Sequence, residues 1–158
     1  MTEVLIVPTG TANIASVMAA FRRLGASPRT CEDPAEVAAA SHVMLPGVGT
    51  VAASMARLVE HGLDEALRQR IAADRPTIAI CVGHQLLFAG SEESPGTTAL
   101  GLVPGTVGRF PAEVRVPQFG WNHVEAGPDC RLIGSGYAYF ANSYRALAAP
   151  GWATATAT

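Results

Sequence analysis

A short apolar run that ends in a cysteine constrains the fold of this chain more than any other stretch. It reads Pro-Thr-Ile-Ala-Ile-Cys-Val-Gly-His-Gln-Leu-Leu-Phe over residues 76–88. Thr77 to Ile80 is apolar and partly β-branched, as is typical of a strand buried on both faces of a parallel sheet. A nucleophile on a sharp strand-to-helix turn requires small residues two positions before and after it, and Ala79 and Gly83 flank Cys81 in this way.

Two interpretations of Cys81 compete. A lone cysteine at a strand end is commonly a buried structural residue. The small residues on both sides favour a nucleophile, and Gln85 to Phe88 read as the first turns of a helix whose N-terminus would stabilise the thiolate. We therefore interpret Cys81 as a catalytic nucleophile.

Composition limits the class of protein. A chain of 158 residues, 49% of them hydrophobic, predicts one domain over residues 1–158 with a substantial core. The formal charge is −2 and the 11 Lys and Arg residues are scattered, so we expect no nucleic-acid binding. No apolar run approaches the length that a membrane span needs, so we expect none. Three cysteines without a C-x-x-C pair favour a reducing, cytoplasmic location and argue against a zinc site. We expect no metal and no cofactor.

Short apolar strands alternate with amphipathic helices through the first half. Asn13 and Asp33 stand at N-cap positions, and Gly25 at a C-cap position. This order predicts an α/β fold, a doubly wound, mostly parallel sheet flanked by helices. We expect strands at 4–7, 28–32, 42–45 and 77–80, and helices at 14–24, 33–40 and, broken near 61–62, 55–71.

Ligand sites in such sheets lie outside the carboxyl ends of the strands. Loops that carry Gly10, Val48 and Cys81 all fall at that edge. The two glycines of Pro46-Gly47-Val48-Gly49 let the backbone approach a ligand and point an amide outward. In the second half we expect short antiparallel strands beside the main sheet, at 106–110, 114–116, around 121–124, 137–144 and 153–158.

These motifs together resemble class I (triad-type) glutamine amidotransferases, and among them the glutaminase subunit of imidazole glycerol phosphate synthase, a histidine-pathway enzyme. The general marks of the class are Pro46-Gly47-Val48-Gly49 and Cys81-Val82-Gly83-His84-Gln85. The marks of the histidine-pathway branch are Asn13-Ile-Ala-Ser-Val17, Gln85-Leu-Leu-Phe88 leading to Ser91-Glu-Glu93, Gly101-Leu-Val-Pro-Gly105 with Arg109-Phe110, and Val116-Pro-Gln-Phe-Gly-Trp-Asn122.

The resemblance implies a glutaminase reaction at Cys81. Its sulfur would attack the side-chain amide of glutamine, giving a glutamyl thioester and ammonia. The backbone amides of Val48 and Val82 would form the oxyanion hole. The residues implied to hold the glutamine are Gly49, Gln85, Glu93, Asn142, Ser143 and Tyr144.

The resemblance also implies a partner. A (β/α)₈ cyclase subunit would bind as the other half of a heterodimer, facing Trp121 and Asn122. It would use the ammonia to make imidazole glycerol phosphate and an aminoimidazole carboxamide ribotide.

The chain departs from the family pattern in several places. The departing residues are Ala12, Ala79, Val82, Gln118-Phe119 and Asn142. The largest departure concerns the triad, which a His-Pro-Glu segment on a late strand completes in the family, whereas no His follows His123. We therefore expect these 158 residues to be truncated before the last strands and helix, and inactive alone. The alternatives are a non-catalytic, amidotransferase-like binding or scaffold subunit, or, ranked last, another cysteine-elbow α/β enzyme.

Overall fold

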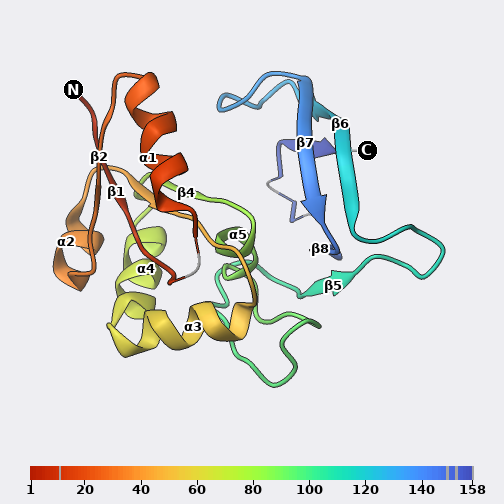
Figure 1. Cartoon of the computed structure of the whole chain (residues 1–158), viewed down its shortest axis with the longest axis horizontal. Helices are drawn as coiled ribbons and strands as arrows, with labels where there is room; N and C mark the ends of the chain where they lie inside the picture. The colour runs from red at the N-terminus through yellow and green to blue at the C-terminus, as the bar shows by residue number, and fades with distance from the viewer. Residues whose placement is uncertain (11, 149, 152, 158) are drawn as a thin grey trace. The chain divides into compact units, whose positions relative to one another are not determined.

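The computed structural model describes residues 1–10, 12–148, 150–151 and 153–157. They form two compact units, Met1–Thr106 and Val107–Thr158, and Figure 1 draws the first of these in red to green. Thr11, in the predicted first turn, and Thr158, at the end of the predicted last strand, lie outside the described residues. The single domain over residues 1–158 stays a prediction.

The first unit is built on a parallel four-stranded sheet with the order β2-β1-β3-β4. The predicted α/β fold with a parallel sheet is therefore confirmed. The strands are β1 (Glu3–Ile6), β2 (Ser27–Thr30), β3 (Val43–Leu45) and β4 (Thr77–Ala79), and the helices are α1 (Ile14–Arg23), α2 (Pro34–Ala39), α3 (Val51–Glu60), α4 (Leu63–Ala72) and α5 (Val82–Gln85).

Side chains alternate between the two faces of this sheet, and each face has its own core. Leu5 and Leu45 pack in one core with residues of α2, α3, α4 and α5. Ile6 and Met44 point the other way and pack against α1. Helices therefore cover both faces, as the doubly wound arrangement predicts. No helix among the residues that the structure describes is long and apolar enough to cross a membrane.

The predicted helix ends are mostly confirmed. The Asn13 side chain accepts a hydrogen bond from Ser16 N, and Asp33 accepts from the amides of the first turn of α2. Gly25 has a φ of +78°, which suits the end of α1. The helix predicted over 14–24 ends at Arg23, and Leu24, which caps it, is 82% exposed.

Strand β4 differs from its prediction. Ile78 and Ile80 are 49% and 51% exposed, so the strand is not buried on both faces. Their side chains lie on the same face as Met44, which is the face that α1 covers over the other strands. Because β4 is the edge of the described sheet, α1 does not reach it.

A buried arginine joins the other end of β4 to the helices. Arg70 in α4 is only 1% exposed. Its guanidinium donates hydrogen bonds to the carbonyls of Val37, Ala40 and Pro76 and to the hydroxyl of Thr77. Two of these carbonyls belong to the last turn of α2, whose dipole favours a cation there. No salt bridge to Arg70 is found among the described residues.

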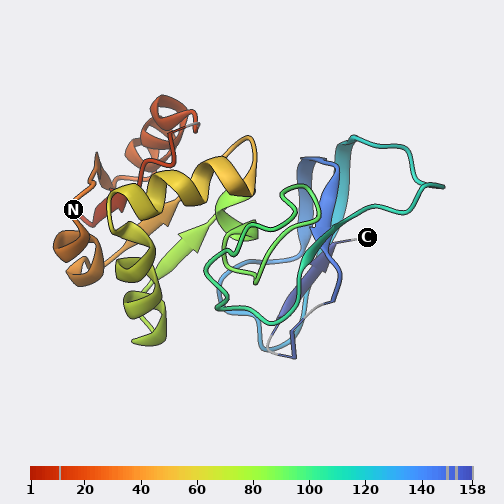
Figure 2. The same ribbon diagram turned by 90° about the horizontal axis from the view of Figure 1, so that it is seen from below.

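The second unit consists of antiparallel strands. Strand β5 (Val107–Arg109) pairs with β8 (Tyr144–Ala146), and β6 (Gln118–Ala126) pairs with both β7 (Gly136–Asn142) and β9 (Ala155–Ala157). Strands β6 and β7 run side by side in both views (Figures 1 and 2).

The predicted antiparallel strands are therefore present, with two corrections. Residues 114–116 form no strand because they belong to a turn that leads into β6. The strand predicted at 137–144 is interrupted at Ser143, which separates β7 from β8.

Candidate active site

The backbone at Cys81 has the conformation of a sharp strand-to-helix turn. Its φ is +56° and its ψ is −119°, a combination that residues with a side chain rarely adopt. Asp74 is the other described residue besides glycine with a positive φ. The thiol of Cys81 is free and exposed. The turn thus presents the sulfur beyond the end of β4, as the nucleophile interpretation requires.

The small residue after the turn is required by close packing. A Cβ atom at Gly83 would collide with the carbonyl oxygen of Leu45 in β3, so no larger residue fits there without moving the backbone. The helix after Cys81 differs from the prediction, because α5 begins at Val82 and is a single turn. Gln85, predicted to start the helix, therefore ends it.

The loops that follow β1, β3 and β4 meet at the carboxyl edge of the sheet. They are joined by hydrogen bonds to the consecutive backbone carbonyls of residues 45–47. The Leu45 carbonyl accepts from Ile80 N at 3.0 Å, and the Gly47 carbonyl accepts from Val82 N at 3.3 Å. Between them, the Pro46 carbonyl accepts from the Thr9 hydroxyl at 3.1 Å. The glycine loop (Pro46–Gly49) is therefore fixed between the end of β1 and the turn at Cys81.

This arrangement has a consequence for the predicted oxyanion hole. The Val82 amide already donates to the Gly47 carbonyl, so in this conformation it is not available to an oxyanion. The Gly47 C=O and the Val48 N–H belong to one peptide and point in opposite directions, because the peptide is trans. The oxyanion role of Val48 and Val82 stays a prediction that requires this peptide to turn.

The residues of the first unit that are predicted to hold glutamine are Gln85 and Glu93, which follow the turn at Cys81, and Gly49 of the glycine loop. The Oε1 atom of Gln85 is buried and has no hydrogen-bond partner among the described residues, although buried carbonyl oxygens normally have one. Gly49 has a φ of +89° directly before α3. Glu93 lies in a loop that the Ser94 hydroxyl joins to the start of α3, by accepting from Ala52 N at 3.1 Å.

The histidines of the first unit do not complete a triad. His42 precedes β3 and so lies at the opposite edge of the sheet from Cys81. His61 caps the end of α3 beside Glu60. His84 follows Cys81 on α5, and its ring packs edge-on against Phe88 at 5.2 Å. His84 remains exposed, yet the protein around its ring lowers its pKa by desolvation. Among the described residues, no group of His, Cys, Asp and Glu could hold a metal ion.

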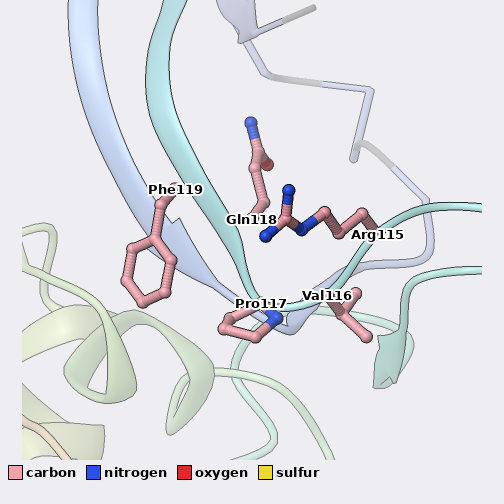
Figure 3. A pocket seen from close by; sticks show the side chains of 5 residues that line it. All are labelled: Arg115, Val116, Pro117, Gln118 and Phe119. Atoms are coloured by element: carbon pink, nitrogen blue, oxygen red, sulfur yellow. The ribbon is translucent and has the colours of Figure 1, made fainter.

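Trp121 and Asn122, predicted to share one partner-facing surface, lie on opposite faces of β6. Neighbouring residues of a strand point to opposite sides, and Figure 3 shows this for Gln118 and Phe119 at the start of β6. Trp121 is 69% exposed and packs edge-on against Tyr139. Asn122 is half-buried and accepts from Gln118 Nε2 at 2.5 Å. The two side chains therefore do not share one face of the strand, and their part in a partner interface stays a prediction.

The exposed side of β6 and β7 carries mostly aromatic rings, which we call the aromatic face. Two ring pairs cross between the strands, since Trp121 packs against Tyr139 and His123 against Tyr137, and Phe119 lies opposite Ala141. The members of the aromatic face are Phe119, Trp121, His123, Tyr137 and Tyr139. Nothing in the sequence beyond strand periodicity marked Tyr137 and Tyr139 as part of it.

Asn142, Ser143 and Tyr144 connect β7 to β8 in the second unit. Asn142 Nδ2 donates to the Tyr144 carbonyl at 3.0 Å, and the Ser143 carbonyl accepts from Phe110 N at 3.2 Å. Because Nδ2 of Asn142 donates this bond, the other side-chain atom, Oδ1, is an acceptor. Oδ1 is buried and has no partner among the described residues. The part of these three residues in a glutamine site stays a prediction.

Solved structures place the fold in a known class. A crystal structure of a glutamine amidotransferase aligns with 93% of this chain and 75% of its own, with a TM-score of 0.74 at 18% identity. A protein from Thermoplasma acidophilum that is assigned to GMP synthase aligns with 99% of this chain and 73% of its own, with a TM-score of 0.64 at 15% identity. The fold is that of the glutamine amidotransferases. No protein-family model matches the chain.

Curated relatives narrow the class to one family. The HisH subunit of imidazole glycerol phosphate synthase from Symbiobacterium thermophilum is 42% identical over 148 residues, which cover 91% of this chain and 70% of the relative. The HisH subunit from Thermus thermophilus is 40% identical over 142 residues, covering 90% and 71%. The chain belongs to the HisH family, the glutaminase subunit of imidazole glycerol phosphate synthase in histidine biosynthesis.

The relatives differ in length from this chain. The chloroplastic hisHF protein of Arabidopsis thaliana is 40% identical over 149 residues, which are 91% of this chain but 25% of that protein. The 158 residues thus correspond to about seven tenths of the bacterial subunits and a quarter of the plant protein.

Proposed function

We propose that Cys81 is the nucleophile that releases ammonia from glutamine. The observation that carries the proposal is the strained turn at Cys81, which exposes a free thiol at the edge where the glycine loop is held. The sulfur attacks the side-chain amide carbonyl, the C–N bond breaks, and ammonia leaves with a proton as the thioester forms. Water then hydrolyses the thioester to glutamate.

The oxyanion hole forms when the peptide between Gly47 and Val48 turns over. The turn moves the Gly47 oxygen away from Val82 N–H and directs Val48 N–H toward the side where the oxyanion develops. Glycine at 47 and the left-handed Gly49 give the backbone freedom on both sides of this peptide. A donor of this kind typically contributes about 3 kcal/mol to transition-state stabilisation.

The polar groups around this turn suit glutamine. The unpartnered Oε1 of Gln85 accepts a hydrogen bond from a bound donor, and the carboxylate of Glu93 attracts the α-ammonium group. Gly49 lets the backbone approach the substrate. The orphaned oxygen of Gln85 is the observation that supports a bound ligand here.

The ammonia is delivered to a cyclase of (β/α)₈ fold, which makes imidazole glycerol phosphate and an aminoimidazole carboxamide ribotide. Because free ammonia escapes into water, its production and use belong in one heterodimer. The HisH relatives are named as subunits of imidazole glycerol phosphate synthase, which supports a partner subunit. Three free cysteines fit a reducing, cytoplasmic location.

The test is labelling by an electrophilic glutamine analogue, in which a chloromethyl ketone replaces the side-chain amide of glutamine. Mass spectrometry is expected to find the adduct on Cys81, and glutamine is expected to slow its formation. The control is Cys81→Ala, in which Cys31 and Cys130 remain. Unchanged labelling in this variant contradicts the proposal. Absence of protection by glutamine would favour a non-catalytic scaffold subunit.

Replacement of Trp121 by alanine is expected to weaken binding of the cyclase by about 2 kcal/mol, because an exposed tryptophan is a frequent interface anchor. Titration calorimetry measures the affinity. The matched control is Leu132→Ala, which removes a 94% exposed apolar side chain of the same unit from outside the aromatic face. Equal affinities of wild type and Trp121→Ala would show that the aromatic face does not carry this interface.

A further inference from the structure

We propose that Thr9 is a positioning residue for the oxyanion hole, acting through the peptide that precedes Gly47. The inference rests on the proposed glutaminase function, since it concerns the same site. Thr9 does not touch the substrate. Its hydroxyl fixes the Pro46 carbonyl, and this restricts the turn described above to the single peptide between Gly47 and Val48.

The three hydrogen bonds to the consecutive carbonyls of residues 45–47 come alternately from two sides of the loop. The carbonyls of Leu45 and Gly47 are held by amides of Ile80 and Val82, on the side of β4 and Cys81. The carbonyl between them is held from the segment that follows β1, by a side chain 37 residues away in sequence. This bond ties the glycine loop to the segment that follows β1.

The hydrogen bond between Thr9 and Pro46 lies in a buried place. Thr9 is 1% exposed, and both Pro46 and Gly47 are buried. Pro46 has no N–H group, so its carbonyl is the only backbone hydrogen-bonding group by which this residue can be fixed. Removal of the Thr9 hydroxyl would leave a buried carbonyl unpaired, and the loop would then relax toward other partners or water.

On its other side, the glycine loop packs against the turn at Cys81. A Cβ atom at Gly47 would lie 2.9 Å from Gly83 N and 3.0 Å from the Val82 Cβ, so the loop already lies against the turn at Cys81. Movement of Pro46 as a whole is limited in that direction. The bond to Pro46 and the packing at Gly47 hold the start of the loop, so we expect the movement at the next peptide, between Gly47 and Val48, with the left-handed Gly49 beyond it.

The experiment compares two reagents on the Cys81 thiol of the 158-residue protein. The glutamine chloroketone passes through an oxyanion when the sulfur adds to its carbonyl, whereas iodoacetamide alkylates the sulfur without one. The variants are Thr9→Val, which keeps the shape and removes the hydroxyl, and Thr9→Ser, which keeps the hydroxyl. Thermal unfolding of both variants confirms that they are folded.

Thr9→Val is expected to lower the maximal rate of chloroketone labelling about tenfold, a part of the 10²–10³ typical of losing an oxyanion donor. The half-saturating concentration and the iodoacetamide rate are expected to stay within about twofold, and Thr9→Ser is expected to restore the chloroketone rate.

Three results would overturn the inference. Equal chloroketone rates in wild type and Thr9→Val would show that the hydroxyl does not matter. An equal loss with both reagents would mean that Thr9 supports the turn at Cys81 in general. A Thr9→Ser variant as slow as Thr9→Val would assign the effect to the methyl group. A fourth result would overturn the proposed function together with this inference. In that case the wild type would react with the chloroketone no faster than Cys81→Ala does.

Discussion

The 158-residue chain is expected to release ammonia from glutamine about 10⁴-fold more slowly than the Symbiobacterium HisH subunit does. Each protein is assayed with its cyclase present. The reason is that the histidines of the first unit do not supply the general base of a triad. Loss of a triad base typically costs about 10⁴ to 10⁶ in rate. His42 lies at the far edge of the sheet, His61 caps α3, and His84 packs its ring against Phe88.

A fusion provides the matched comparison for this prediction. The part of the Symbiobacterium protein that follows its aligned region is joined to residue 158, and ammonia release is measured for the chain, the fusion and the relative. The fusion is expected to recover most of the rate. Turnover of the chain within about tenfold of the relative would contradict the prediction. Alanine substitutions would then identify the histidine responsible among His42, His61, His84 and His123.

Replacement of Arg70 by methionine is expected to lower the free energy of unfolding by about 3–4 kcal/mol. Methionine fills a similar volume but leaves the buried Val37 carbonyl and the half-buried Ala40 carbonyl without this donor, whereas the Pro76 carbonyl keeps its bond from Val43 N. Each unsatisfied buried group costs about 1–3 kcal/mol, partly offset because the guanidinium is no longer desolvated. Urea denaturation monitored by circular dichroism measures the change.

Arg75→Met is the matched control. Arg75 also donates to a carbonyl of α2, that of Ala39, but it is exposed. Its replacement is expected to cost less than about 1 kcal/mol, because water replaces the lost donor. Arg70→Lys is expected to retain only part of the stability, since one ammonium group cannot reach four acceptors in the planar arrangement of a guanidinium. Equal stabilities of Arg70→Met and Arg75→Met would contradict the prediction.

Sequence patterns predicted the parts of the fold that depend on local chemistry. Asn13, Asp33 and Gly25 were placed correctly because caps are determined by the hydrogen bonds and φ values of a few consecutive residues. The turn at Cys81 belongs to this group, since the need for a small residue at Gly83 follows from the way a helix leaves a strand.

Properties that depend on distant residues were not predicted. The exposure of Ile78 and Ile80 follows from which strand is at the sheet edge, and no local pattern contains that information. Thr9 was missed because its hydroxyl bonds to a carbonyl on another loop, and a threonine after a strand usually has no such role. The opposite orientation of Trp121 and Asn122 is different, since strand periodicity alone would have separated them.

The φ of +56° at Cys81 makes the reactive position a weak point of the fold. A side chain in such a conformation costs on the order of 1–3 kcal/mol, whereas glycine adopts it with almost no penalty. The substitution that best relieves the backbone is therefore the one that removes the sulfur. Selection for thermal stability alone would favour Cys81→Gly, so that activity and robustness place opposite demands on this one codon.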